Sequence, residues 1–108
     1  MKVLSIIPAR GGSKGIKLKN LVILNRKPLL YYTVTASLNS KIINKTVVST
    51  DNKTIAKTAV KLGAEVIVRP KKLATDTAKL EPVIEHVLKY LKENEKYNPD
   101  IIVILQNT

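Results

Sequence analysis

The side chains with the clearest chemistry lie in a glycine-rich basic loop that follows the first apolar run. The run over 3–8 is followed by Arg10, by glycines at 11, 12 and 15, and by lysines at 14, 17 and 19, with no acidic residue among them. Glycines let backbone N–H groups surround an anion, and the cationic side chains add full charges to those amide dipoles. The loop therefore predicts a site for a highly anionic ligand, with a nucleoside triphosphate as the expected occupant.

Two familiar phosphate motifs do not fit this loop. Walker A needs four residues between its glycines, and only three separate Gly11 from Gly15. The dinucleotide fingerprint Gly-x-Gly-x-x-Gly fails because the glycines fall at 11, 12 and 15. No helix signal follows directly, so we expect a long phosphate loop of another kind that continues to about Asn25.

The elements that must position this loop alternate between strand and helix patterns, which predicts a parallel sheet with helices on both faces. This is a Rossmann-like, three-layer α/β/α fold. The first, second and fourth strands are nearly all apolar, as central parallel strands should be. The runs that predict strands are 2–8, 46–50, 65–68 and 100–105.

Three helices are expected between these strands. Pro28 can open the first helix at its first turn, Asp51 or Asn52 can cap the second, and Gly63 can end it. The third helix is expected over about 80–93. The apolar stripes are Leu30, Val34 and Leu38 in the first helix, Ile55, Ala59 and Leu62 in the second, and Ile84, Val87, Leu88 and Leu91 in the third.

Polar residues follow the end of each predicted strand. In open parallel sheets ligands bind beyond the carboxyl ends of the strands. We therefore expect the glycine-rich loop, Asp51, Arg69 and Gln106 to converge on one edge of the sheet.

The charge of the chain is unevenly placed. The formal net charge is +11; residues 1–50 hold nine Lys/Arg and no acid, while residues 51–108 hold ten Lys/Arg and eight acids. The basic first half would attract a polyphosphate, although a generally lysine-rich composition also explains the total. Nucleic-acid binding is a weaker alternative, because only four tyrosines and no Phe or Trp are available for base stacking.

Composition bounds the remaining classes. No apolar run approaches the roughly twenty residues of a membrane helix, and a Gly/Lys loop replaces the pattern of a signal peptide. The absence of cysteine excludes a disulfide framework and a thiolate metal site. These features predict a single cytoplasmic domain over 1–108 without membrane contact.

Four ordered segments resemble the acylneuraminate cytidylyltransferases, also called CMP-sialic acid synthetases. Asn107 stands where that family carries proline. The segments are Pro8-Ala9-Arg10-Gly11-Gly12-Ser13-Lys14-Gly15 with Lys19-Asn20, then Val48-Ser49-Thr50-Asp51, then Arg69-Pro70 with Leu73-Ala74-Thr75-Asp76-Thr77-Ala78, and finally Leu105-Gln106-Asn107-Thr108.

The resemblance implies transfer of CMP from CTP to a nonulosonic, sialic-acid-like sugar acid, with release of pyrophosphate. It implies that this chain is the amino-terminal, CTP-binding half of a longer synthetase, that it works as a homo-oligomer, and that complete catalysis is not expected of it alone. Mg²⁺ would arrive with CTP, because the family's metal-binding aspartates lie in the other half. No residue of this chain is therefore assigned to a metal.

The resemblance also implies the site residues. Arg10 and Lys19 are expected to be the catalytic phosphate ligands, Arg69 to reach the base or ribose, and Gln106 to touch nucleotide and sugar acid. The other residues of the phosphate cradle are Ala9, Gly11, Gly12, Ser13 and Asn20.

Each assignment has a plainer alternative. Arg10 and Lys19 could be solvated cations of the loop, and Asn20 could be a turn residue. Lys14 could equally point into solvent or contact a phosphate. Arg69 could pair with a nearby acid at a strand end. Asp51 and Asp76 fit helix caps better than ligands, and the single histidine, His86, fits a helix surface. At the level of function, the alternatives are a basic nucleic-acid-binding module and a non-catalytic assembly fragment whose sheet edge pairs with another chain.

Overall fold

Four parallel strands form the centre of the fold. The computed structural model describes residues 1–11, 21–73 and 79–106. In chain order the elements are β1 (Val3–Pro8), β2 (Ile23–Leu24), β3 (Lys27–Pro28), α1 (Leu29–Leu38), β4 (Lys45–Thr50), α2 (Lys53–Leu62), β5 (Glu65–Val68), a 3₁₀ helix (Lys71–Leu73), α3 (Leu80–Glu95) and β6 (Ile101–Ile104). The predicted alternation of strands and helices is confirmed.

The order of the strands in the sheet is β5-β4-β1-β6, and every pair is parallel. β1 is therefore central, with Ile6 opposite Val47 on one side and Ile104 on the other. The prediction that the last strand is central is wrong for the described residues. β6 lies at the edge, and Ile101 at its start is 44% exposed.

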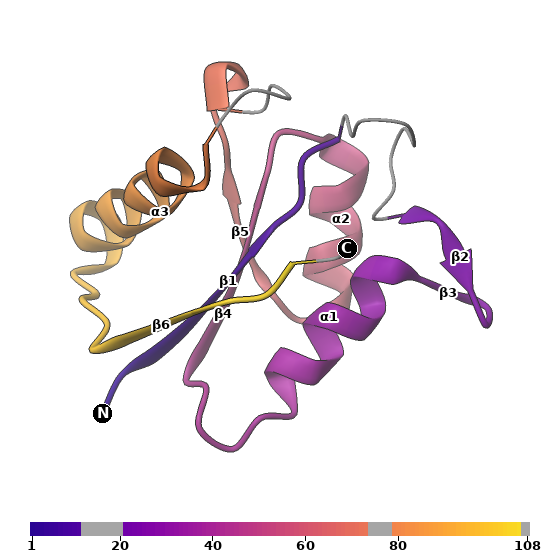
Figure 1. Ribbon diagram of the computed structural model, residues 1–108, viewed down its shortest axis with the longest axis horizontal. Coiled ribbons are helices and arrows are strands. Elements are labelled where there is room, and N and C mark those ends of the chain that lie inside the picture. Colours follow the sequence, from indigo (N-terminus) through magenta and orange to yellow (C-terminus); the bar gives the residue numbers. More distant parts are fainter. Residues whose placement is uncertain (12–20, 74–78, 107–108) are drawn as a thin grey trace.

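Helices cover both faces of the sheet, with α1 and α2 on one face and α3 on the other (Figure 1). Alternate residues of β1 point to opposite faces, so Ile7 packs with α1 and α2 while Ile6 packs with α3. The predicted three-layer α/β fold is confirmed. The buried helix residues are Leu30 and Val34 of α1, Ile55 and Ala59 of α2, and Val83, Val87 and Leu91 of α3.

Local signals place the ends of α2 correctly, and they fail in part at α1. The Asn52 side chain caps α2 by accepting the N–H of Ile55 at 2.9 Å, and Gly63 ends the helix at φ +100°. In α1 the predicted stripe is wrong at its last position, since Leu38 is exposed. Ser37 is buried instead, and its hydroxyl is satisfied by that of Thr46 at 2.6 Å.

A short antiparallel hairpin of β2 and β3 occupies part of the segment that was expected to be loop. Its two turn residues, Asn25 and Arg26, have φ values of 50° and 68°, as in the tight turns that suit hairpins. The Tyr32 hydroxyl of α1 donates to the carbonyl of Leu24 at 2.6 Å, which fastens the hairpin to the helix. Pro28 ends β3 and caps α1 rather than standing in its first turn.

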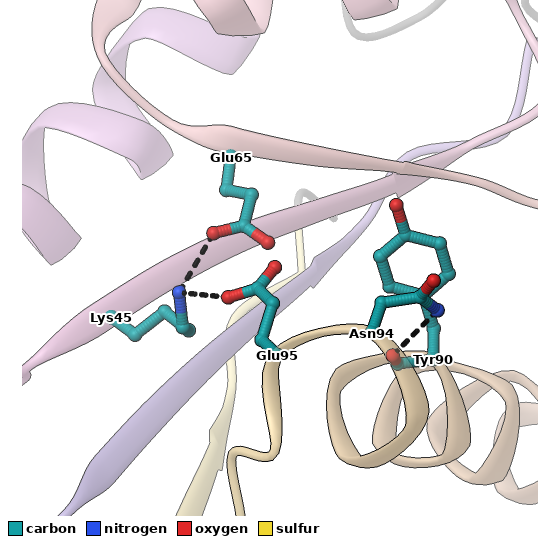
Figure 2. A network of polar contacts seen from close by, with 5 residues as sticks. All are labelled: Lys45, Glu65, Tyr90, Asn94 and Glu95. Atoms are coloured by element: carbon teal, nitrogen blue, oxygen red, sulfur yellow. Dashed lines mark hydrogen bonds and ion pairs between the residues drawn. The ribbon is translucent and has the colours of Figure 1, made fainter.

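A cluster of charges ties α3 to the sheet at the edge opposite the carboxyl ends of the strands. The Nζ of Lys45 lies 2.7 Å from Oε1 of Glu65 and 2.9 Å from Oε1 of Glu95 (Figure 2), and it lies 5.2 Å from the ring centre of Tyr97. Burial and the hydrogen bond with Glu95 raise the pKa of Glu65, whereas the hydrogen bonds with Glu65 and Lys45 lower the pKa of Glu95. The two carboxyl groups therefore interact with each other as well as with the ammonium group of Lys45.

None of the helices in the described ranges combines the length and apolarity that a membrane crossing requires.

Candidate functional site at the carboxyl edge of the sheet

The described candidate residues lie at the carboxyl ends of the strands, as predicted. Ala9, Arg10 and Gly11 follow β1, Asp51 follows β4, and Arg69 follows β5. Backbone bonds hold these ends together, from the Ala9 N–H to the Ser49 carbonyl at 2.9 Å and from the Arg69 N–H to the Thr50 carbonyl at 2.8 Å. Three neighbouring strands thus deliver residues that are far apart in the sequence to one edge.

Gln106 reaches the same edge from the other side of β1. It is exposed and follows β6, whereas Arg69 follows β5 at the opposite side of the sheet. Three strand spacings of about 4.8 Å put these two strand ends roughly 14 Å apart. The candidate residues therefore span a length that suits an extended ligand, such as a nucleotide with a second substrate beside it.

A groove opens next to Gln106. Its volume is about 480 Å³, and it lies between α1 and the end of β6. The residues that line it are Tyr32, Thr33, Ala36, Ile104, Leu105 and Gln106.

The two backbone positions at the end of β1 are already engaged within the protein. Ala9 is buried in the core that faces α1 and α2, and its N–H is bonded to β4. The Gly11 N–H donates to Oδ1 of Asp51 at 2.8 Å. Gly11 also lies so close to α2 that an added Cβ would be 2.9 Å from both Cβ and Nδ2 of Asn52. Glycine at position 11 is thus explained by this close approach as well as by any ligand.

Asp51 does not cap α2, so that prediction is wrong. Asn52 provides the cap, because its side chain is the one that reaches Ile55. Asp51 instead holds the N–H of Gly11 at the start of the glycine-rich loop. Two adjacent residues could each have capped the helix, and only the structure distinguishes their roles.

Arg69 is the most buried cationic residue of the site, with 5% of its surface exposed. Its Nε donates to the Ser49 hydroxyl at 3.2 Å, its Nη2 to the Ser49 carbonyl at 3.0 Å, and its Nη1 to the Leu73 carbonyl at 3.2 Å. Burial lowers the pKa of Arg69; the charge of Asp51 opposes this effect and that of Arg10 adds to it. The guanidinium is thus anchored through hydrogen bonds to β4, and Asp51 acts on it as a charge.

Arg10 and Arg69 bring two guanidinium groups to the same region. Arg10 is half-buried, and it lies close enough to affect the ionisation of Arg69. Two guanidinium groups near one another, one half-buried and one buried, give this edge a positive potential that favours a polyanion.

Sequence reasoning missed two neighbours of Arg69. Ser49 is fully buried and accepts two hydrogen bonds from Arg69. The position of Ser49 at the end of β4, directly before Thr50-Asp51, is the sequence signal that could have identified it. His86 was expected on the helix surface, yet it is half-buried. Burial is the main cause that lowers the pKa of His86, and the positive charges of Arg69 and Lys89 lower it further. Its Nδ1 is buried without a hydrogen-bond partner in the part of the chain that the structure describes. These surroundings therefore favour the neutral imidazole of His86 over its charged form.

Several predicted positions lie outside the described residues. They are Gly12, Ser13, Lys14, Lys19, Asn20, Asp76 and Asn107. Over residues 1–11, 21–73 and 79–106 there is no group of three or more His, Cys, Asp or Glu side chains that could hold a metal ion.

Comparisons with known proteins agree on one family. The family profile described as "Cytidylyltransferase" matches residues 4–108. An N-acylneuraminate cytidylyltransferase of Escherichia coli is 42% identical over 96 residues, which cover 89% of this chain and 23% of that protein. A CMP-N,N'-diacetyllegionaminic acid synthase of Legionella pneumophila is 41% identical over 110 residues, which cover 100% of this chain and 47% of that protein.

The fold agrees as well. A solved structure of a CMP:2-keto-3-deoxy-manno-octonic acid synthetase in complex with CTP superposes with a TM-score of 0.80 at 23% identity, covering 98% of this chain and 40% of that one. The chain thus spans less than half the length of the proteins that it resembles.

Proposed function

The chain belongs to the cytidylyltransferase family, and we propose that it binds CTP along the carboxyl edge of its sheet. In this proposal it supplies the nucleotide-binding half of a reaction that transfers CMP to a nonulosonic sugar acid. The observation that carries the proposal is the meeting of Arg10, which directly follows the Ala9 backbone bond to β4, with the buried Arg69 at that edge. The rest of the catalytic machinery would come from sequence that the relatives carry beyond the matched region.

The proposed chemistry is a displacement at phosphorus. The anomeric hydroxyl of the sugar acid attacks the α-phosphorus of CTP and loses its proton, a new O–P bond forms, and the bond to the bridging oxygen breaks to release pyrophosphate. Such reactions depend mainly on positioning and charge neutralisation. Arg10 and Lys19 would hold the phosphates, and Gln106 the junction between nucleotide and sugar acid. Arg69, whose guanidinium is buried and bonded to Ser49 and Leu73, would act on the nucleotide through its charge.

Mg²⁺ belongs to this proposal as a companion of the nucleotide. The described residues of the edge offer one carboxylate, Asp51, and one of its oxygens already accepts the Gly11 N–H. Mg²⁺ commonly keeps most of its contacts to phosphates and water. This donor set therefore fits an ion that enters bound to CTP, where it would neutralise phosphate charge.

The choice of sugar acid, a homo-oligomeric state and a cytoplasmic location are parts of the same proposal. The relatives' names include N-acylneuraminate and diacetyllegionaminic acid, so family membership leaves the sugar acid open within the nonulosonic class.

A calorimetric titration with CTP and Mg²⁺ tests this function. Arg10→Ala and Lys19→Ala are each expected to weaken binding by about tenfold or more, since each removes a charge-assisted contact to phosphate. The charge-matched control is Lys92→Ala, because Lys92 is exposed in the last turn of α3. Unchanged affinity in both site variants, or equal binding of CTP and the control anion sulfate, would contradict the proposal.

A second candidate function is assembly through the edge of the sheet. β6 has a neighbour on one side only among the described strands, and Ile101 and Ile102 are both exposed. Such an edge can accept a further strand from another polypeptide. This candidate requires no nucleotide.

A further inference from the structure

Resting on the proposed function, we infer that Asp51 is a positioning residue for the nucleotide site. Its carboxylate holds the amide of Gly11, which directly follows Arg10, and so fixes the backbone that presents the Arg10 side chain to phosphate. Asp51 is exposed, yet Oδ1 lies 2.8 Å from the Gly11 nitrogen. A hydrogen bond to an ionised group is stronger and more directional than a neutral one.

This bond lies where it can affect the backbone at the end of β1. Gly11 is the last described residue before the predicted cradle, and the end of β1 lies beside the start of α2 (Figure 1). Ala9 is fixed to β4 through its own N–H. With the Gly11 amide also held on the β4 side by Asp51, the backbone is fixed on both sides of Arg10.

The same bond corrects the expected role of the Gly11 amide. An N–H that donates to Asp51 does not at the same time point into a phosphate cradle. Gly11 therefore serves the site through its small size and its anchored amide, and in this proposal the phosphate contact at this end of β1 falls to Arg10.

The negative charge of the Asp51 carboxylate also acts against the binding of an anion. It lies near enough to Arg69 to stabilise that cation, and a negative charge at this edge opposes the approach of a triphosphate. Positioning and charge thus act in opposite senses on CTP binding, and this opposition separates them experimentally.

The substitution pair Asp51→Ala and Asp51→Asn tests the inference. Asn keeps an oxygen acceptor for Gly11 and removes the charge, whereas Ala removes both. Asp51→Ala is expected to weaken CTP binding by about tenfold, and Asp51→Asn to bind as tightly as the unaltered protein or more tightly. If Asp51 acted only through its charge, Asp51→Asn and Asp51→Ala would have the same effect on CTP binding. Tighter binding by Asp51→Asn than by Asp51→Ala would therefore point to the hydrogen bond with Gly11.

The matched control is Asp100→Ala. Asp100 accepts the Lys2 N–H at 2.7 Å, which is the same type of bond at the opposite end of β1, and its loss should leave CTP affinity unchanged. Both Asp51 variants are expected to fold, because Asn52 and not Asp51 caps α2.

Amide hydrogen exchange at Gly11, followed by NMR without nucleotide, separates failure of this inference from failure of the proposed function. The Gly11 amide should be protected in the unaltered protein and in Asp51→Asn, and should exchange faster in Asp51→Ala. If that pattern holds and CTP does not bind to any form, the anchoring stands and the proposed function falls. If Asp51→Ala binds CTP normally, or Asp51→Asn is as weak as Asp51→Ala, the positioning role is overturned.

Discussion

At the scale of single residues, Gly11 shows how one position serves both fold and site. A glycine in a phosphate loop is usually credited to close approach by a ligand. Here the close approach is already made by Asn52 of α2, whose Cβ would lie 2.9 Å from an added methyl group. The glycine is therefore required before any ligand binds.

We predict that Gly11→Ala destabilises the protein by about 1–2 kcal/mol, because the new methyl group displaces Asn52 and loosens the cap of α2. Urea denaturation measures this change in the free energy of unfolding.

A double-mutant cycle supplies the control for Gly11→Ala. Asn52→Gly removes the obstructing side chain, and as a cap it should cost only a few tenths of a kcal/mol. In the Asn52→Gly background the Gly11→Ala change should then cost much less. A cost of equal size in both backgrounds would show that the contact with Asn52 is not the cause.

Residue types at the edge were predictable from the sequence, and their partners were not. The ends of the strands predicted that Arg69 and Asp51 lie at this edge, Arg69 as a ligand of the base or ribose and Asp51 as a helix cap. Nothing in the sequence distinguishes an arginine that faces a ligand from one whose guanidinium bonds to Ser49 and Leu73, because these contacts join residues on different elements.

At the scale of elements, the charge cluster of Lys45, Glu65 and Glu95 links the end of α3 to β4 and β5 (Figure 2). It holds the helix at the amino ends of the strands, away from the proposed nucleotide site. Its ionisation can therefore affect stability without a direct effect on the ligand.

This cluster predicts a pH dependence of stability. The pKa of Glu65 is raised in the folded protein, first by burial and then by the hydrogen bond with Glu95, so the folded state holds this proton more tightly than the unfolded state. That contribution is present below the ordinary range of a glutamate, about 4.3, and is lost as pH rises through the raised pKa. Glu65→Gln, which cannot lose a proton, should flatten the dependence between mildly acidic and neutral pH.

The effect should be modest, under about 1 kcal/mol, because the cluster is partly exposed to solvent. Urea unfolding at a series of pH values measures it. Glu93→Gln, in the more exposed pair with Lys89 at 3.9 Å, is the control and should leave the profile unchanged. A Glu65→Gln profile identical to that of the unaltered protein would contradict the predicted contribution of Glu65.

The elements differ in how much of them the sequence reveals. β5 has the bounds that its apolar run predicts, 65–68, and α2 starts and stops at its capping residues because those signals are local. The hairpin of β2 and β3 was missed because strands of two residues are too short to show alternation, and its turn is Asn25-Arg26 without a glycine. The edge position of β6 was missed because burial of a strand depends on its neighbours and not on its own composition.

At the scale of the whole molecule, the sheet ends in an apolar strand whose outer side is open within the described residues. Ile101 is exposed there, and no lysine or proline within β6 discourages pairing with another chain. The groove beside the end of β6 extends this accessible region toward α1.

We predict that the chain self-associates as its concentration rises and that Ile101→Lys keeps it monomeric, because a charge on an edge strand opposes strand addition. Sedimentation velocity over a range of concentrations measures this. Val60→Lys, on the exposed face of α2, is the control and should associate as the unaltered chain does. A chain that is monomeric at every concentration would remove the assembly candidate, whereas equal association of both variants would place the contact elsewhere.

The central place of β1 in the sheet also has a kinetic consequence. One neighbour of β1 begins at residue 45, but the other pairs Val3 with Ile101, near the far end of the chain. On the ribosome, one flank of the first strand must wait until β6 has emerged. Pairings between such remote segments slow folding, so the nascent protein keeps an apolar flank of β1 uncovered for that time, and uncovered apolar surface is prone to aggregation.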